Sequence, residues 1–289
     1  MATWTDRYWN SADGVKLHYR DHDGNRDRPP ILCIPGLTRN ARDFEPVADR
    51  FAGEWRVISI DLRGRGLSAF DPVPANYKPM VYVADILKLL DQLGIADAVF
   101  VGTSLGGICT MALALSDRER IAGALLNDIG PVVDLVGIER IAAYVGKPVI
   151  FSDWDDAIDQ TAARTHDVYP DYDRLDWERF VRRMAIEDNG RVRFDYDMRI
   201  ADNFESAAAA PDVWPLYQAL NGRPVTILRG ELSDLLTAEV AERMASAIDD
   251  AELVTVPRVG HAPSFDEHES IAALERLLDR VEKAQETRP

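Results

Sequence analysis

The chain has 289 residues and a formal net charge of −16 at pH 7, with 33 Lys and Arg against 49 Asp and Glu. This charge repels nucleic-acid phosphates and anionic lipid headgroups, so we expect neither nucleic acids nor membranes as partners. The length suits one large domain, with room for an insertion. The sequence has no signal-peptide pattern and no apolar run of about 18 residues, which favours a cytoplasmic protein.

The predicted elements begin with a hairpin and continue as short buried strands. Asp13-Gly14 is a turn signal between two strand-like pieces, so the chain should open with an antiparallel pair. Near-continuous apolar runs, typical of strands buried on both faces, follow at 30–34, 56–60, 98–101, 124–126, 225–228 and 253–256. Helical patterns separate or follow these runs at 44–51, 81–93, 108–115 and 271–281. We therefore predict an α/β fold with a mostly parallel eight-stranded sheet flanked by helices.

The strand pattern disappears between Pro131 and Pro224, where helical patterns stand instead. We predict a core of residues 1–130 and 225–289, interrupted by a helical cap over 131–224. Aromatic residues are frequent in this segment and as a group predict an apolar pocket roof: Tyr144, Trp154, Tyr169, Tyr172, Trp177, Phe180, Phe194, Tyr196, Trp214 and Tyr217. Trp154, Trp177 and Trp214 are the predicted substrate-binding residues. The alternative for each is packing within the cap's own core.

A candidate nucleophile follows the strand predicted at 98–101. This run ends at Gly102-Thr103-Ser104-Leu105-Gly106 and passes directly into a helical pattern. A serine on a sharp strand-to-helix turn needs glycine two residues before and two after it, because side chains there would collide with the neighbouring strand and helix. The motif and its context predict that Ser104 is a nucleophile.

Other motifs do not indicate a cofactor or a metal. The run Gly64-Arg65-Gly66-Leu67-Ser68-Ala69 imitates a dinucleotide fingerprint, but the prolines at 72 and 74 prevent the helix that this motif must open. We instead expect Arg63 and Arg65 to brace the loops around the Ser104 turn. Cys33 and Cys109 lie in apolar runs without metal-ligand or redox spacing, and we expect buried free thiols. No cofactor and no metal are predicted.

Four segments of the chain resemble the α/β-hydrolase family over nearly its whole length. They are 34–38, 61–68, the glycine-flanked Ser104 turn and 259–263, each placed after a predicted strand. The family usually has His-Gly in the first segment, where this chain has Pro35 before Gly36. This departure concerns loop support more than chemistry. The resemblance implies a nucleophile, an acid and a histidine in that chain order.

The acid and the base follow from position. His261 lies on a Gly-flanked loop after the last core strand, and it is the predicted general base. Asp234 follows the strand at 225–228, from where a carboxylate can reach the imidazole, and it is the predicted acid. Asp128 after the strand at 124–126 is the alternative, because some similar proteins carry the acid there. Asp128 could instead form hydrogen bonds within the loop where the cap begins, without a role as the acid.

Two backbone amides complete the predicted site. The N–H of Leu105 begins the helix after Ser104, and the N–H of Leu37 should face it across the edge of the sheet. Together they would form an oxyanion hole. Arg39 could border the pocket, but we favour an exposed arginine beside Asp43.

The resemblance implies a cofactor-independent serine hydrolase that cleaves a small or medium apolar ester or lactone through an acyl-enzyme. It also permits C–C bond hydrolysis, acyl transfer to an acceptor other than water, or perhydrolysis with the same residues. Haloalkane dehalogenation and epoxide hydrolysis are disfavoured, because those relatives carry aspartate in place of Ser104. A small-molecule receptor on the same scaffold is a further alternative.

Overall fold

The computed structural model describes residues 2–203 and 213–286. Its main sheet has eight strands in the order β1-β2-β4-β3-β5-β6-β10-β11, which confirms the predicted sheet. β1 and β2 form the antiparallel hairpin, β2 is also antiparallel to β4, and the remaining pairs are parallel. The bounds are β1 (Thr5–Asn10), β2 (Lys16–His22), β3 (Ile31–Ile34), β4 (Val57–Asp61), β5 (Ala98–Thr103), β6 (Ile121–Asn127), β10 (Val225–Gly230) and β11 (Ala251–Val256).

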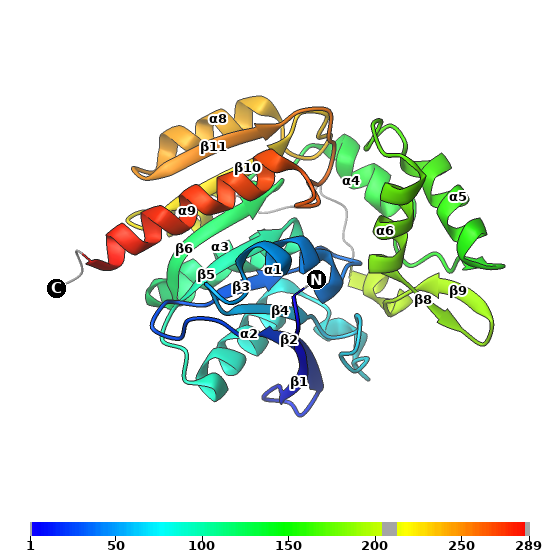
Figure 1. Cartoon of the computed structure of the whole chain (residues 1–289), viewed down its shortest axis with the longest axis horizontal. Coiled ribbons are helices and arrows are strands. Elements are labelled where there is room, and N and C mark those ends of the chain that lie inside the picture. The colour runs from blue at the N-terminus through cyan, green and yellow to red at the C-terminus, as the bar shows by residue number, and fades with distance from the viewer. Residues whose placement is uncertain (1, 204–212, 287–289) are drawn as a thin grey trace.

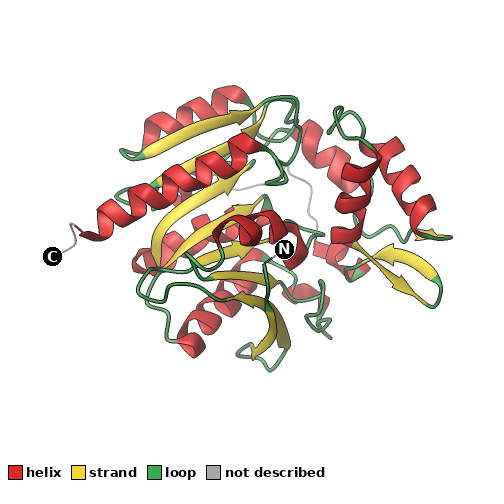
Figure 2. Cartoon of the chain, viewed as in Figure 1, coloured by secondary structure: helices red, strands yellow, loops and turns green. Residues whose placement is uncertain are grey.

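Helices cover both faces of this sheet (Figure 1, Figure 2). Leu32 and Ile34 of β3 pack in one apolar cluster, and Ile31 and Cys33 pack in the other. The first cluster includes residues of α2 (Pro79–Leu93), α3 (Leu105–Asp117), α7 (Trp214–Gln218) and α8 (Ala238–Ala247). The second includes residues of α1 (Glu45–Phe51) and α9 (His268–Glu286). Burial on both faces explains why these strands are continuous apolar runs in the sequence.

The segment from 135 to 203, here called the cap segment, lies beside one end of the main sheet (Figure 1). It contains α4 (Leu135–Ala142), α5 (Trp154–Thr165), α6 (Arg174–Met184) and the 3₁₀ helix η4 (Met198–Asn203). It also contains an antiparallel sheet in the order β7-β9-β8, formed by β7 (Ile150–Phe151), β8 (Ala185–Asp188) and β9 (Arg191–Phe194). The helices of the predicted cap are present, and the small sheet beside them was not predicted. The domain boundaries at 131 and 224 stay a prediction.

Both cysteines are free and buried, as expected. Within 2–203 and 213–286, no helix is long and apolar enough to cross a membrane.

Candidate active site

Ser104 lies on a tight turn between β5 and α3. Its φ of 50° and ψ of −111° are unusual for a residue with a side chain. A Cβ on Gly102 would overlap the backbone of Gly106, and a Cβ on Gly106 would overlap the backbone of Ile34. The backbone N–H of Ser104 donates to Asn127 O on β6 at 2.9 Å. The two glycines are therefore required by backbone packing, as the motif predicted.

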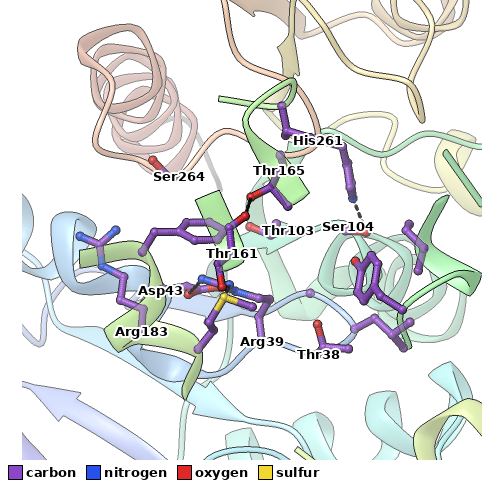
Figure 3. Close-up of a pocket in the computed structure, with 18 of the residues that line it drawn as sticks. Thr38, Arg39, Asp43, Thr103, Ser104, Thr161, Thr165, Arg183, His261 and Ser264 are labelled. Carbon is purple, nitrogen blue, oxygen red and sulfur yellow. Dashed lines mark hydrogen bonds and ion pairs between the residues drawn. The ribbon is translucent and has the colours of Figure 1, made fainter. Parts of the chain in front are cut away.

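His261 reaches Ser104 from the loop after β11. Its Nε2 lies 3.0 Å from Ser104 Oγ, and Figure 3 shows the ring directed at the serine. Two hydrogen bonds hold the loop directly after the histidine. Asn127 Nδ2 donates to Pro263 O at 2.8 Å, and the hydroxyl of Tyr169 in the cap segment donates to Ala262 O at 2.8 Å. The position of the imidazole thus depends on both the main sheet and the cap segment.

Asp128 is the carboxylate that contacts His261. Its Oδ2 lies 2.8 Å from His261 Nδ1, and the residue is 0% exposed. Gly230 N donates to Oδ1 at 2.9 Å and Ser233 Oγ donates to Oδ2 at 2.6 Å. A carboxylate fixed by three hydrogen bonds can hold one imidazole tautomer, with a proton on Nδ1 and a free lone pair on Nε2 toward Ser104.

The prediction that Asp234 orients His261 was wrong. Asp234 instead forms a bidentate ion pair with Arg140 on α4, in which Arg140 Nη2 donates to Oδ1 at 2.8 Å. Burial acts to raise the pKa of Asp234, but the hydrogen bonds and charge of Arg140 outweigh it and lower that pKa. The backbone of Asp234 also accepts from Gly137 N on α4 at 3.0 Å. Asp234 therefore connects the main domain to the cap segment.

The two predicted oxyanion amides remain available in the structure. Neither Leu37 N nor Leu105 N donates a hydrogen bond to another described residue. Leu37 lines the cavity beside Ser104. Arg65, which is fully buried, donates from Nε to Leu37 O at 2.8 Å and from Nη1 to Arg63 O at 2.7 Å. The expectation that Arg65 braces a loop beside the Ser104 turn fits these contacts.

Ser104 and His261 open into a cavity of about 510 Å³ between the main domain and the cap segment. Five of the predicted cap aromatics line it, namely Tyr144, Tyr169, Phe180, Phe194 and Tyr196. The three tryptophans are not among its lining residues. Trp177 is buried against Tyr169. Trp154 stacks with Arg182 and contacts Glu187. Trp214 packs on Tyr217 and Arg243. The three tryptophans therefore pack against neighbouring side chains, which was the alternative to substrate binding for each.

The cavity wall is more polar than the sequence suggested. Four arginines and a lysine line it: Arg39, Arg140, Lys147, Arg164 and Arg183. Arg39 was expected at the surface, but its side chain is only 16% exposed, because it packs into this wall while it pairs with Asp43. Burial acts to lower the pKa of Arg39, but Asp43 raises it, and the net shift is upward. Arg39 is therefore a charged wall residue.

The cations differ in how far they are neutralised. Arg39, Arg140 and Arg183 each have a carboxylate partner, respectively Asp43, Asp234 and Asp266. Lys147 and Arg164 are exposed, and neither forms an ion pair with a described residue. Sequence reasoning missed both, because a basic residue on an exposed helix or loop carries no motif.

Comparisons with known proteins identify the family. The model described as "Alpha/beta hydrolase family" matches residues 31–274. A 3-hydroxybutyrate-oligomer hydrolase from Cupriavidus necator is 33% identical, over 86% of this chain and 88% of that protein. A 2-(acetamidomethylene)succinate hydrolase from Mesorhizobium japonicum is 27% identical, over 81% of each. The crystal structure of an alpha/beta hydrolase from Novosphingobium aromaticivorans DSM 12444 is 51% identical with a TM-score of 0.93, and the match covers 97% of this chain and 99% of that chain. The chain belongs to the alpha/beta hydrolase family.

Proposed function

We propose that this protein is a serine hydrolase that cleaves esters of short hydroxyacids through an acyl-enzyme. The observation that carries this proposal is the chain of hydrogen bonds from Ser104 through His261 to Asp128, at 3.0 Å and 2.8 Å, at the end of a cavity of about 510 Å³. A serine hydroxyl becomes a competent nucleophile when a neighbouring imidazole accepts its proton. A buried carboxylate then stabilises the imidazolium that forms.

In the first half of the reaction, Ser104 Oγ attacks the ester carbonyl and its proton passes to His261 Nε2. Asp128 holds the Nδ1 proton and stabilises the charged ring. The carbonyl oxygen becomes an oxyanion, for which the backbone N–H groups of Leu37 and Leu105 are the donors. The tetrahedral intermediate collapses, the alcohol leaves with the proton from His261, and an acyl-Ser104 ester remains.

In the second half, water attacks the acyl-Ser104 carbonyl and gives its proton to His261 Nε2. The same two amides receive the second oxyanion. Collapse returns the proton to Ser104 Oγ and releases the carboxylic acid. Each residue is thereby restored to its starting state.

Two observations support a hydroxyacid ester as the substrate. The relative at 33% identity is a 3-hydroxybutyrate-oligomer hydrolase, and the match covers 88% of its length. In this chain, Lys147 and Arg164 line the cavity, and neither forms an ion pair with a described residue. An oligomer of a hydroxyacid ends in a carboxylate, which these cations would attract. This substrate is more polar than the small or medium apolar ester that the family resemblance implied.

The test uses the purified protein, p-nitrophenyl butyrate and the linear dimer of 3-hydroxybutyrate. We expect turnover of both by the wild type, labelling of Ser104 by a fluorophosphonate, and loss of at least about 10⁴-fold in kcat in Ser104→Ala. Mass spectrometry of the labelled peptide identifies the modified serine. Wild-type turnover by Ser104→Ala, or labelling at another residue, would overturn the nucleophile assignment.

A second comparison tests the charge on the wall. The methyl ester of the dimer lacks the terminal carboxylate, and it is otherwise matched to the free acid. Replacing Lys147 and Arg164 by alanine should raise KM for the free acid more than for its methyl ester, because the methyl ester has no charge to attract. Equal changes in the two KM values would contradict this part of the proposal.

A further inference from the structure

Thr161 is a cavity residue whose hydroxyl has no hydrogen-bond partner among the described residues. It lies on α5, lines the cavity and is 5% exposed. Its Oγ1 is buried and forms no hydrogen bond with a described residue. Thr165, one turn later, also lines the cavity, but its hydroxyl donates to Thr161 O at 2.7 Å. A buried hydroxyl without a partner is unfavourable, so a ligand group that bonds to it is favoured at this point.

Arg39 supplies a second polar group to the same cavity. Its side chain begins next to the nucleophile, because a Cβ on Gly36 would lie 3.5 Å from Arg39 Cγ and 3.8 Å from Ser104 Cβ. Arg39 Nε and Nη2 donate to Asp43 at 2.7 Å and 2.6 Å. Its Nη1 faces only Met184 Sδ at 3.0 Å among the described residues, and a thioether is a weak acceptor. Nη1 therefore keeps donor capacity for a ligand oxygen.

The charges in this part of the cavity favour a neutral ligand group. Asp43 neutralises Arg39, and Asp266 neutralises Arg183, which has Glu45 Oε2 at 3.9 Å as well. A substrate carboxylate placed beside Arg39 would meet the carboxylate of Asp43, with which the charge of Arg39 is already paired. A hydroxyl can accept from Arg39 and donate to Thr161 or Asp43 without adding charge. Figure 3 shows Thr161, Arg39 and Asp43 on the side of the cavity away from His261.

From this placement we propose that Thr161, Arg39 and Asp43 form a subsite for a hydroxyl group on the acyl chain of the substrate. The inference rests on the proposed function, and it deepens it by assigning a hydroxyacyl chain to this part of the cavity. The subsite selects acyl chains that carry a hydroxyl near the scissile carbonyl over the unsubstituted chains of the same length. A site built to bond a hydroxyl discriminates against the analogue that lacks it, because its polar groups are then left unpaired.

The experiment measures kcat/KM for p-nitrophenyl 3-hydroxybutyrate, each enantiomer separately, and for p-nitrophenyl butyrate. The readout for each enantiomer is its kcat/KM divided by the kcat/KM of p-nitrophenyl butyrate. In Thr161→Val, which keeps the shape and removes the hydroxyl, the ratio for the preferred enantiomer should fall about tenfold. Thr161→Ser should restore it. Thr165→Val is the matched control, since its hydroxyl already bonds to the helix backbone, and it should keep the wild-type ratio.

A ratio unchanged in Thr161→Val, or lowered equally in Thr165→Val, would overturn the subsite. A purely structural effect of Thr161→Val would lower both kcat/KM values together and leave the ratio unchanged. A wild type that hydrolyses neither ester would contradict the proposed function instead. In that event, calorimetric binding of 3-hydroxybutyrate and butyrate to the wild type and Thr161→Val decides the subsite. Tighter binding of 3-hydroxybutyrate that is lost in the variant supports it, and equal binding overturns it.

Discussion

Asp128 Oδ2 and His261 Nδ1 lie 2.8 Å apart, although 133 residues separate them in the chain. Asp128→Asn would present an amide to Nδ1, favour the wrong imidazole tautomer and lower kcat by about 10⁴-fold. Asp234→Asn should change kcat by less than about tenfold, since Asp234 contacts Arg140 of the cap segment and not the imidazole. Steady-state kinetics on one ester compares the two variants.

Two controls accompany this comparison. Thermal unfolding shows that each variant is folded, and the rate of inactivation by a fluorophosphonate reports how well His261 activates Ser104. The inactivation rate should fall with kcat in Asp128→Asn and remain close to wild type in Asp234→Asn. An active Asp128→Asn enzyme beside an inactive Asp234→Asn enzyme would return the acid to Asp234.

The core of the fold could be predicted because its strands leave a simple signal. Strands buried on both faces are continuous apolar runs, and the Ser104 turn needs glycine at two fixed positions. The acid could not be chosen in this way. Asp128 follows β6 and Asp234 follows β10, and these strands are neighbours in the sheet. Both carboxylates therefore follow the same ends of neighbouring strands. Which of them contacts His261 depends on the hydrogen bonds from Gly230 and Ser233 that hold Asp128, and these form only in the folded chain.

The cap segment was harder to predict, for two different reasons. Its β8–β9 hairpin has an overlooked signal, because Asn189-Gly190 is a favoured two-residue turn and both residues have positive φ, 52° and 72°. The roles of the tryptophans have no such signal. Helical spacing indicates which side chains share a face, but it does not show whether that face meets a cavity or another helix. Trp177, for example, packs against Tyr169, which itself lines the cavity.

Arg65 should position the oxyanion hole through its bond to Leu37 O. Arg65→Lys keeps a positive charge but loses the planar group that bonds Leu37 O and Arg63 O together. Displacing one oxyanion donor rather than removing it should lower kcat by about tenfold with little change in KM. Steady-state kinetics gives kcat and KM of Arg65→Lys, and thermal unfolding shows whether the variant is folded.

Arg63→Lys is the matched control for Arg65→Lys. Arg63 is buried in the same loop, but its guanidinium bonds to Asp13, Asp71 and Asp85 and not to the loop of Leu37. This variant should lower the unfolding temperature because three carboxylates lose their shared partner. A larger loss of kcat in Arg63→Lys than in Arg65→Lys would contradict the role given to Arg65.

His22 should make folding stability depend on pH. Burial, reinforced by the charge of Arg20, lowers the pKa of His22 below its ordinary value of 6.5. The unfolded chain then binds more protons than the folded chain as pH falls below about 6.5, so the free energy of unfolding decreases in that range. His22→Gln removes this contribution and should show a smaller decrease between pH 7.5 and 5.5 in urea titrations. His268→Gln, which removes an exposed imidazole, is the matched control. Equal slopes in the wild type and His22→Gln would show that the buried imidazole does not carry this dependence.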